Sequence, residues 1–214
     1  LINIAVDYYK TFGPAKEKFL SYYYQGRVYD DLEDYESAML SYLEAESIHS
    51  KKIPLRHLTS LYMKKGRIYQ HYYDLEKSVN AFRKAQSLAL QCDWKSNYFN
   101  ALLGELAQNV IFEKQKEADS LIRLIMPFRD EMPLKAQMLF DIRRLLLSRS
   151  RMPQDSLYAC TRAFEDSYSS LKNFQWDVLS SCYSKAGALS DAERALSHYK
   201  EQVDEPNNDL RYLK

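Results

Sequence analysis

Glycine and proline are scarce in this sequence, which has 5 Gly and 6 Pro among 214 residues. Loop-rich and all-β chains need more of both residues at their turns, so this scarcity favours helix. Cysteine is also rare: Cys92, Cys160 and Cys182 are odd in number and give no paired disulfide framework. No apolar run approaches the ~20 residues that a membrane-spanning helix needs. These absences predict an all-α chain without a membrane span in this region.

An excess of one charge is missing as well. The net charge is +1, from 30 Lys and Arg against 29 Asp and Glu, and both signs are interspersed along the chain. Proteins that bind nucleic acids usually have a high pI or a basic patch. The densest basic stretch runs from Arg143 to Arg151 and is typical of the solvated side of a helix and the turn after it. We therefore expect no nucleic-acid binding through this region.

Motifs of catalysis and metal binding are absent too. The sequence has no G-x-x-x-x-G-K-[ST] loop, no G-x-G-x-x-G, no H-E-x-x-H and no G-x-S-x-G. The four His residues are scattered, and the cysteines lack the spacing of zinc ligands. Acidic residues such as Glu33 and Asp34 fit a helix N-terminus, where they complement the helix dipole. We expect no catalytic residue, no metal, no cofactor and no enzyme activity.

Two segments of the sequence align with each other without gaps. Residues 19–29 lie over residues 59–69, and the clearest pairs are Tyr22 with Tyr62, Gly26 with Gly66 and Tyr29 with Tyr69. The match continues with Ala38 over Ser78, Tyr42 over Phe82 and Ala45 over Ala85. The chain therefore contains an internal repeat, whose period is the constant offset between these pairs.

The repeat resembles the tetratricopeptide repeat (TPR), which has aromatic residues at positions 4, 11 and 24 and small residues at 8, 20 and 27. The resemblance implies one antiparallel helical hairpin per unit, in which small residues let the helices approach and aromatic rings fill the remaining space. The family's repeat has ~34 residues and the period here is ~40 residues, which implies longer helices or longer turns. Stacked hairpins of this family form a right-handed α-α superhelix, a solenoid.

We predict a single array of about five hairpins over residues 1–214. The predicted hairpins are residues 14–53, 54–93, 94–132, 133–170 and 171–205. The third and fourth depart from the family pattern, and the fifth restores it with Trp176, Leu179, Tyr183, Gly187 and Ala192. Residues 1–13 resemble the second helix of a preceding hairpin, and residues 206–214 are a tail or the start of a next helix. We therefore expect the chain to be part of a longer protein.

In this family the first helix of each hairpin lines the concave groove. The corresponding positions here are Tyr23, Arg27 and Asp30 in the first hairpin and Met63, Arg67 and Gln70 in the second. Parallel arginines beside apolar anchors suit an acidic group or a C-terminal carboxylate. The other interpretation is that both arginines are exposed and pair loosely with Asp30 or Asp31. The Lys-and-Asn clamp with which some family members hold a peptide C-terminus is not present at these positions.

Cys160 and Cys182 lie nearly symmetrically about the turn expected near residues 170–171. Antiparallel helices would bring them opposite each other, but a disulfide needs Cα atoms within ~7 Å and packed helices lie ~8–10 Å apart. The sequence therefore does not decide whether Cys160 and Cys182 form a disulfide.

The resemblance implies a non-catalytic scaffold that binds a protein or peptide ligand in the concave groove. The alternative is the ligand-sensing part of a larger bacterial regulator, such as a membrane-tethered transcription factor, a histidine kinase or a peptide-sensing regulator. Tyrosine-rich repeats of similar length also occur in such regulators. An output domain elsewhere in the protein would favour the alternative.

Overall fold

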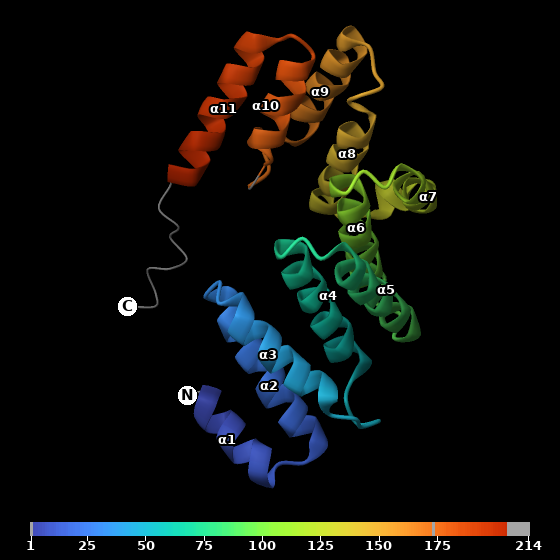
Figure 1. Ribbon diagram of the computed structural model, residues 1–214. Coiled ribbons are helices and arrows are strands. Elements are labelled where there is room, and N and C mark those ends of the chain that lie inside the picture. The colour runs from blue at the N-terminus through green and yellow to red at the C-terminus, as the bar shows by residue number, and fades with distance from the viewer. Residues whose placement is uncertain (1, 173, 205–214) are drawn as a thin grey trace. The chain divides into compact units, whose positions relative to one another are not determined.

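The structure is a computed structural model that describes residues 2–172 and 174–204. All regular structure within these residues is helical (Figure 1), which confirms the expected all-α class. The helices are α1 (Ile2–Phe12), α2 (Ala15–Asp31), α3 (Tyr35–Ser47), α4 (Leu55–His71), α5 (Leu75–Gln91), α6 (Lys95–Ile111), α7 (Gln115–Ile125), η1 (Met126–Glu131), α8 (Leu134–Ser148), α9 (Gln154–Tyr168), α10 (Trp176–Lys185) and α11 (Leu189–Asp204). From α2 onward, two α-helices lie within each predicted hairpin range. The tail or next helix predicted at residues 206–214 lies outside the described residues.

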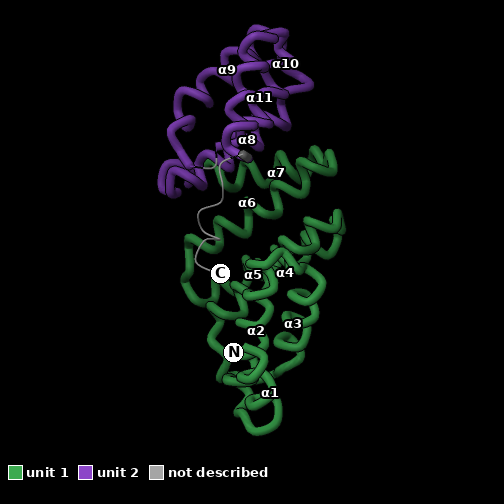
Figure 2. The backbone as a smooth tube through the Cα atoms, turned by 90° about the vertical axis from the view of Figure 1, so that its left-hand side faces the viewer, with its two compact units in different colours: residues 1–127 green, residues 128–214 purple. Residues whose placement is uncertain are grey.

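The chain divides into two compact units, residues 1–127 and residues 128–214 (Figure 2). Unit 1 contains α1 to α7, and its core gathers large side chains such as Phe19, Tyr42 and Leu61. Unit 2 contains α8 to α11, with a core around Ile142, Leu157 and other apolar residues. Neighbouring helices pack in pairs within each unit. A continuous array across both units stays a prediction.

One kind of tight turn recurs in unit 1. Each of these turns contains a residue with positive φ, namely Glu33 (61°), Tyr73 (56°), Asp93 (48°) and Glu113 (55°). The N–H of the next residue donates to a carbonyl five residues back, as from Asp34 to Tyr29 and from Asp74 to Tyr69, both at 2.9 Å. This is the Schellman ending of a helix.

The lengths of the helices and connections explain the long period of the repeat. The helices α2, α4, α5 and α6 each have 17 residues, and only three residues separate α4 from α5 and α5 from α6. Two such helices with two such turns give the offset from the start of α4 to the start of α6. Between Gly26 and Gly66 the same offset includes the shorter helix α3, of 13 residues, and the longer connection formed by residues 48–54. The longer period thus comes from longer helices in the second hairpin and partly from a longer connection in the first.

Two aspartates begin the second helices of the first two hairpins. The Asp34 carboxylate accepts a hydrogen bond from the Ser37 N–H at 3.1 Å, and Asp74 does the same for Lys77 at 3.1 Å. A side-chain oxygen at this position satisfies a backbone donor that the helix cannot satisfy itself. The role expected for Asp34 at a helix N-terminus is confirmed.

Glycine sets how closely the helices of unit 1 approach. A Cβ atom on Gly26 would lie 2.6 Å from the Tyr42 ring, and one on Gly66 would lie 2.9 Å from the Phe82 ring. Both rings are almost fully buried. Ser78, which replaces alanine in the second repeat, donates its hydroxyl to the Gly66 carbonyl at 2.9 Å. The small residues of the repeat therefore act as close-contact positions, as the resemblance implies.

Unit 2 has one tight pair and one loose pair of helices. The turn between α10 and α11 has the same ending as the turns of unit 1, with Gly187 at φ 80° and the Ala188 N–H donating to the Tyr183 carbonyl at 3.0 Å. In contrast, α8 and α9 are joined by the longer segment 149–153 and make few backbone contacts. This loose pair is the predicted fourth hairpin, the one that departs most from the family pattern.

Candidate functional site

The two apolar anchors predicted for the groove are buried. Tyr23 is 6% exposed and Met63 is 9% exposed. The Tyr23 ring stacks on Phe19, with 6.0 Å between ring centroids, and meets His57 of α4 edge-on at 5.9 Å. Met63 packs in a cluster with Phe82 of α5. Both side chains thus pack against neighbouring helices, and their place in a binding groove stays a prediction. Burial also raises the pKa of Tyr23.

The charged members of the predicted groove differ from one another in their contacts and exposure. Asp30 forms an ion pair with Lys64 of α4, so it is not the partner of an arginine. Arg27 and Arg67 are both exposed, and neither forms an ion pair within the residues that the structure describes. The Arg27 guanidinium lies 5.8 Å from the centroid of the Tyr24 ring. Gln70 is half-buried at the end of α4.

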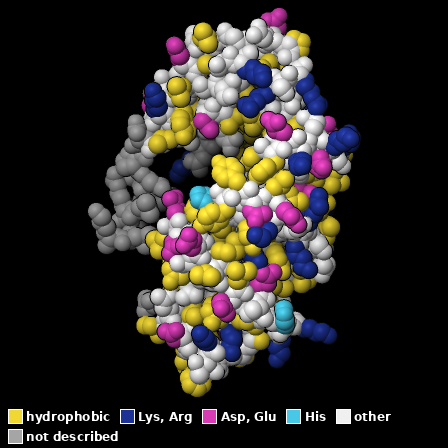
Figure 3. Space-filling model, viewed as in Figure 1, with side chains coloured by type: hydrophobic (Ala, Val, Ile, Leu, Met, Phe, Trp, Pro, Cys, Tyr) yellow, Lys and Arg dark blue, Asp and Glu magenta, His cyan; other side chains and the backbone are white. Residues whose placement is uncertain are grey.

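The repeat register alone does not indicate Lys64, because it lies outside the groove positions carried over from the family. The structure places it with Asp30 because α2 and α4 contact each other through their side chains, as in the ring contact of Tyr23 with His57. The two arginines at one repeat position remain exposed on the helices that this ion pair joins. Figure 3 shows basic and acidic side chains interspersed with hydrophobic ones on the face in view.

A cavity of about 310 Å³ lies on α4 and α5. We call it the lysine–tyrosine cavity, and it is lined by Tyr62, Lys65, Tyr69, Lys77, Asn80, Ala81 and Lys84. A second cavity of about 630 Å³ shares Tyr62 and Lys84 with it and reaches His49, Lys51 and the connection between α3 and α4. Neither set of residues was predicted as a site. The only sequence signal is the recurrence of lysines and tyrosines on neighbouring helices.

An ion pair joins Lys65, which lines the lysine–tyrosine cavity, to α3. Lys65 is 5% exposed and pairs with Glu46 of α3, and the Tyr62 hydroxyl donates to the same carboxylate at 2.6 Å. Burial would raise the pKa of Glu46, but hydrogen bonds from Lys65 and Tyr62 and the charge of Lys65 hold that pKa below its usual range. The Lys65 ammonium also lies 5.7 Å from the centroid of the Tyr62 ring. Lys65 and Glu46 are thus fixed, and the other lysines line the opening.

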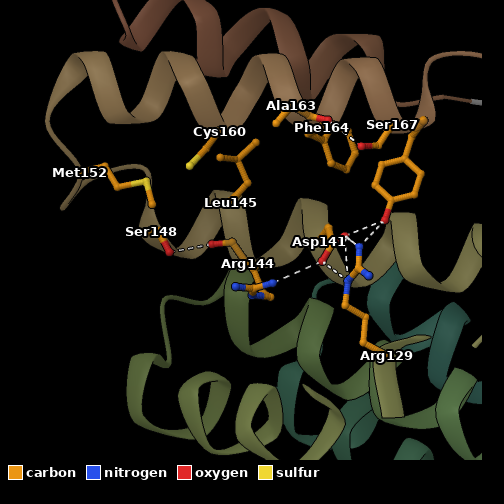
Figure 4. Close-up of a pocket in the computed structure, with 11 residues that line it drawn as sticks. Arg129, Asp141, Arg144, Leu145, Ser148, Met152, Cys160, Ala163, Phe164 and Ser167 are labelled. Carbon is orange, nitrogen blue, oxygen red and sulfur yellow. Dashed lines mark hydrogen bonds and ion pairs between the residues drawn. The ribbon is translucent and has the colours of Figure 1, made fainter. Parts of the chain in front are cut away.

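A third cavity, of about 350 Å³, lies between α8 and α9 (Figure 4). We call it the α8–α9 cavity. Leu145 from α8 and Cys160 from α9 point toward one another, with Met152 at one end (Figure 4). Its lining is Arg129, Asp141, Arg144, Leu145, Ser148, Met152, Cys160, Ala163, Phe164, Ser167 and Tyr168.

A hydrogen-bonded network forms the other end of the α8–α9 cavity. The Asp141 carboxylate accepts from Arg129 Nε at 3.1 Å and Nη2 at 2.5 Å, and from the Tyr168 hydroxyl at 2.6 Å. Burial would raise the pKa of Asp141, but these hydrogen bonds and the charge of Arg129 lower it. Burial and the bond to Asp141 raise the pKa of Tyr168 to about 12. The contact of Arg144 with Asp141 is long, at 3.4 Å, and the Arg144 guanidinium also lies 5.7 Å from the centroid of the Phe140 ring.

The three cysteines are free thiols in the structure. Cys160 is exposed and lines the α8–α9 cavity, whereas Cys182 is buried in the core of unit 2. Burial raises the pKa of Cys182 to about 11. The disulfide left open by the sequence is not formed in the structure.

Among the described residues, no three His, Cys, Asp or Glu side chains are placed to hold a metal ion. No helix within residues 2–172 and 174–204 combines the length and the apolar character that crossing a membrane requires.

The fold defines an all-α protein of paired helices. One solved structure that is similar to it is the crystal structure of BtubC (BKLC) from P. vanneervenii, with a TM-score of 0.65 and 13% sequence identity. The alignment covers 97% of this chain and 90% of that chain. At this identity the likeness concerns the fold alone. No family model and no curated protein matches the sequence.

Proposed function

We propose that the chain is a non-catalytic scaffold that binds a protein or peptide, built from tetratricopeptide-like hairpins in a right-handed superhelix. The observation that carries the proposal is the lysine–tyrosine cavity on α4 and α5, which shares two lining residues with the larger cavity beside it. Ammonium groups between aromatic rings suit an acidic segment of a partner, since they offer charged donors and apolar contact together.

The charges of this surface favour an anionic partner. Lys65 is neutralised by Glu46, and the Lys77 ammonium lies 2.9 Å from an Asp74 oxygen. Lys84 and Lys51 are exposed and form no ion pair within the described part of unit 1. Two ammonium groups are therefore available to a partner's carboxylates. The exposed side chain of Lys77 can also turn toward a partner at little cost, because an exposed ion pair is weak.

Arg27 and Arg67 form a second proposed contact surface. They are the exposed members of the groove predicted from the family resemblance, whereas Asp30 and Gln70 beside them are half-buried. With Tyr23 and Met63 buried, this surface offers charge without an apolar anchor. We rank it second for that reason.

Binding of an acidic peptide tests both surfaces. A fluorescein-labelled peptide of alternating Glu and Leu should bind the chain, and Lys51→Glu with Lys84→Glu should weaken binding ~10-fold or more. Each charge-assisted hydrogen bond is worth ~1.5–3 kcal/mol, and repulsion adds to its loss. Fluorescence anisotropy at two salt concentrations gives the dissociation constants.

Matched charge reversals serve as controls. Lys95→Glu with Lys116→Glu makes the same change of charge at exposed positions that line neither cavity, and it should alter binding less than threefold. Arg27→Glu with Arg67→Glu tests the second surface in the same assay. Equal weakening by all three pairs would show a non-specific charge effect and would reject both sites. No binding by the unmodified chain would reject an acidic peptide as the partner.

The second candidate function is the ligand-sensing part of a larger bacterial regulator. The α8–α9 cavity favours it, because a sensor needs a pocket for a small ligand and this cavity lies between two loosely packed helices. An output domain in the same polypeptide, such as a helix-turn-helix or kinase domain, would decide for this candidate. A polypeptide containing repeats alone would decide for the scaffold.

A further inference from the structure

The α8–α9 cavity has a structural cause. Its walls contain four small side chains, Ser148, Cys160, Ala163 and Ser167. In unit 1, small residues coincide with close approach and with a ring that fills the remaining space. Here the helices do not approach closely, so the same kind of residue leaves a space. That space is of the size that small ligands occupy.

The apolar part of the cavity wall is held in place by packing. Phe164 is 6% exposed, and its ring packs 5.1 Å from the Tyr168 ring and 5.5 Å from the Phe174 ring, between centroids. Leu145 is 7% exposed and belongs to the same core cluster. An apolar group that entered the cavity would therefore be covered by side chains that are already held in place, which reduces the entropic cost of binding.

The charged groups of the cavity select an anion. Two guanidinium groups and one carboxylate line it. The Asp141 carboxylate is already occupied by Arg129 and Tyr168, so it offers little to a ligand cation. Arg144 is 42% exposed and has only its 3.4 Å contact with Asp141 as an ion pair. A guanidinium group has five N–H donors in a planar fork that matches a carboxylate. Arg144 therefore keeps donors for a ligand.

We propose that the α8–α9 cavity binds a small amphipathic carboxylate, with its apolar body against Leu145 and Phe164 and its carboxylate at Arg144. This proposal does not depend on the peptide-binding scaffold, whose cavities lie in unit 1. It would supply the ligand that the regulator candidate needs. Each of the two proposals can therefore be rejected by its own experiment without affecting the other.

Cys160 provides a reporter inside the cavity. Phenylacetate is the probe, and 2-phenylethylamine and 2-phenylethanol are its cationic and neutral counterparts. Alkylation of the intact chain by iodoacetamide is followed at each cysteine by peptide mass spectrometry. Phenylacetate at about 10 mM should slow alkylation of Cys160 at least about threefold while leaving Cys92 unchanged, since millimolar affinity is expected for so small a ligand. The amine should give no protection at the same concentration.

Two variants test separately the charge of Arg144 and the space inside the cavity. Arg144→Gln should remove the preference for phenylacetate over 2-phenylethanol, because the neutral probe does not use the guanidinium. Ala163→Trp should fill the cavity and abolish the heat of phenylacetate binding in calorimetry. Ala159→Trp, at an exposed position of the same helix that does not line the cavity, should keep that heat. Circular dichroism confirms that each variant is folded.

The proposal is overturned by any of three results. Equal protection of Cys160 by phenylacetate and 2-phenylethylamine would show that charge plays no part. Unchanged phenylacetate preference in Arg144→Gln would remove the assigned partner. No protection of Cys160 by phenylacetate would remove the site for this class of ligand.

Discussion

At the scale of single residues, the buried polar side chains show which contacts stabilise the fold. Asp141 is held by Arg129 and Tyr168, and Glu46 by Lys65 and Tyr62. Tyr42 differs from these residues, since its hydroxyl is buried without a hydrogen-bond partner in the described structure. A satisfied buried group stabilises the fold, and an unsatisfied one costs free energy.

Tyr42→Phe should therefore stabilise unit 1 by ~1 kcal/mol. The ring that packs against Gly26 is kept, and only the unpaired hydroxyl is removed. Urea unfolding measured by the fluorescence of Trp94, which lies in unit 1, gives the free energy of unfolding. Tyr62→Phe is the matched control, because its hydroxyl donates to Glu46 and its loss should destabilise. A lower stability of Tyr42→Phe would mean that the hydroxyl does have a partner.

Asp141→Asn should destabilise unit 2 by ~1–3 kcal/mol, because it removes the charged acceptor that Arg129 and Tyr168 share and leaves Arg129 only the exposed Asp130. The pKa of Asp141 is lowered in the folded state. Its contribution to stability is therefore complete above the ordinary aspartate pKa of ~3.9 and is lost as the pH falls through the lower, folded-state pKa. Urea unfolding followed by Trp176 fluorescence should show a smaller difference between variant and parent at pH 3 than at pH 7. A difference that does not change with pH would contradict this role.

Among the helices and turns, the turn after each 17-residue helix of unit 1 sets the repeat. The residue with positive φ is Glu, Tyr or Asp in unit 1, and Gly187 takes the equivalent place in unit 2. Side chains with a Cβ adopt this left-handed conformation at a cost of ~1–2 kcal/mol per residue. The helix ends are therefore held by their hydrogen bonds against local strain.

Tyr73→Gly should stabilise unit 1 by up to ~1 kcal/mol. Tyr73 has φ 56° and is 73% exposed, so glycine relieves strain and removes little packing. Tyr72→Gly is the control, since Tyr72 has φ −86° and is 51% exposed; there glycine should destabilise by ~0.5–1 kcal/mol. Thermal unfolding of both variants measures the difference. Equal shifts in the two melting temperatures would argue that the backbone conformation is not the cause.

For the molecule as a whole, the balance of charge limits what the chain binds. The net charge is +1, and both signs share the surface seen in Figure 3. Attraction to nucleic acid grows with the number of phosphates that a protein neutralises. The lysines of unit 1 are partly matched by Glu46 and Asp74, which is consistent with the short acidic segment proposed as the partner.

Duplex DNA should accordingly bind weakly. At about 150 mM salt we expect a dissociation constant weaker than ~10⁻⁴ M, beyond the usual range of non-specific DNA binders. Electrophoretic mobility shifts with a labelled duplex measure it, and the acidic peptide assay under the same salt is the comparison. Micromolar DNA binding that is lost in Lys51→Glu with Lys84→Glu would replace the peptide proposal with a nucleic-acid one.

The all-α class, the constant offset between the first two repeats and the aspartate that begins a helix could all be predicted from the sequence, because they depend on local propensity and on spacing along one chain. The sequence left open whether longer helices or longer turns cause the long period, and the structure shows longer helices from α4 to α6 and a longer connection after α3. The packing of the helices was needed to show that Tyr23 and Met63 are buried, that Lys64 pairs with Asp30, and that α8 and α9 enclose a cavity. These features depend on how neighbouring helices rotate and how closely they approach. A repeat register fixes which residues share a helix face, but it does not fix what that face meets.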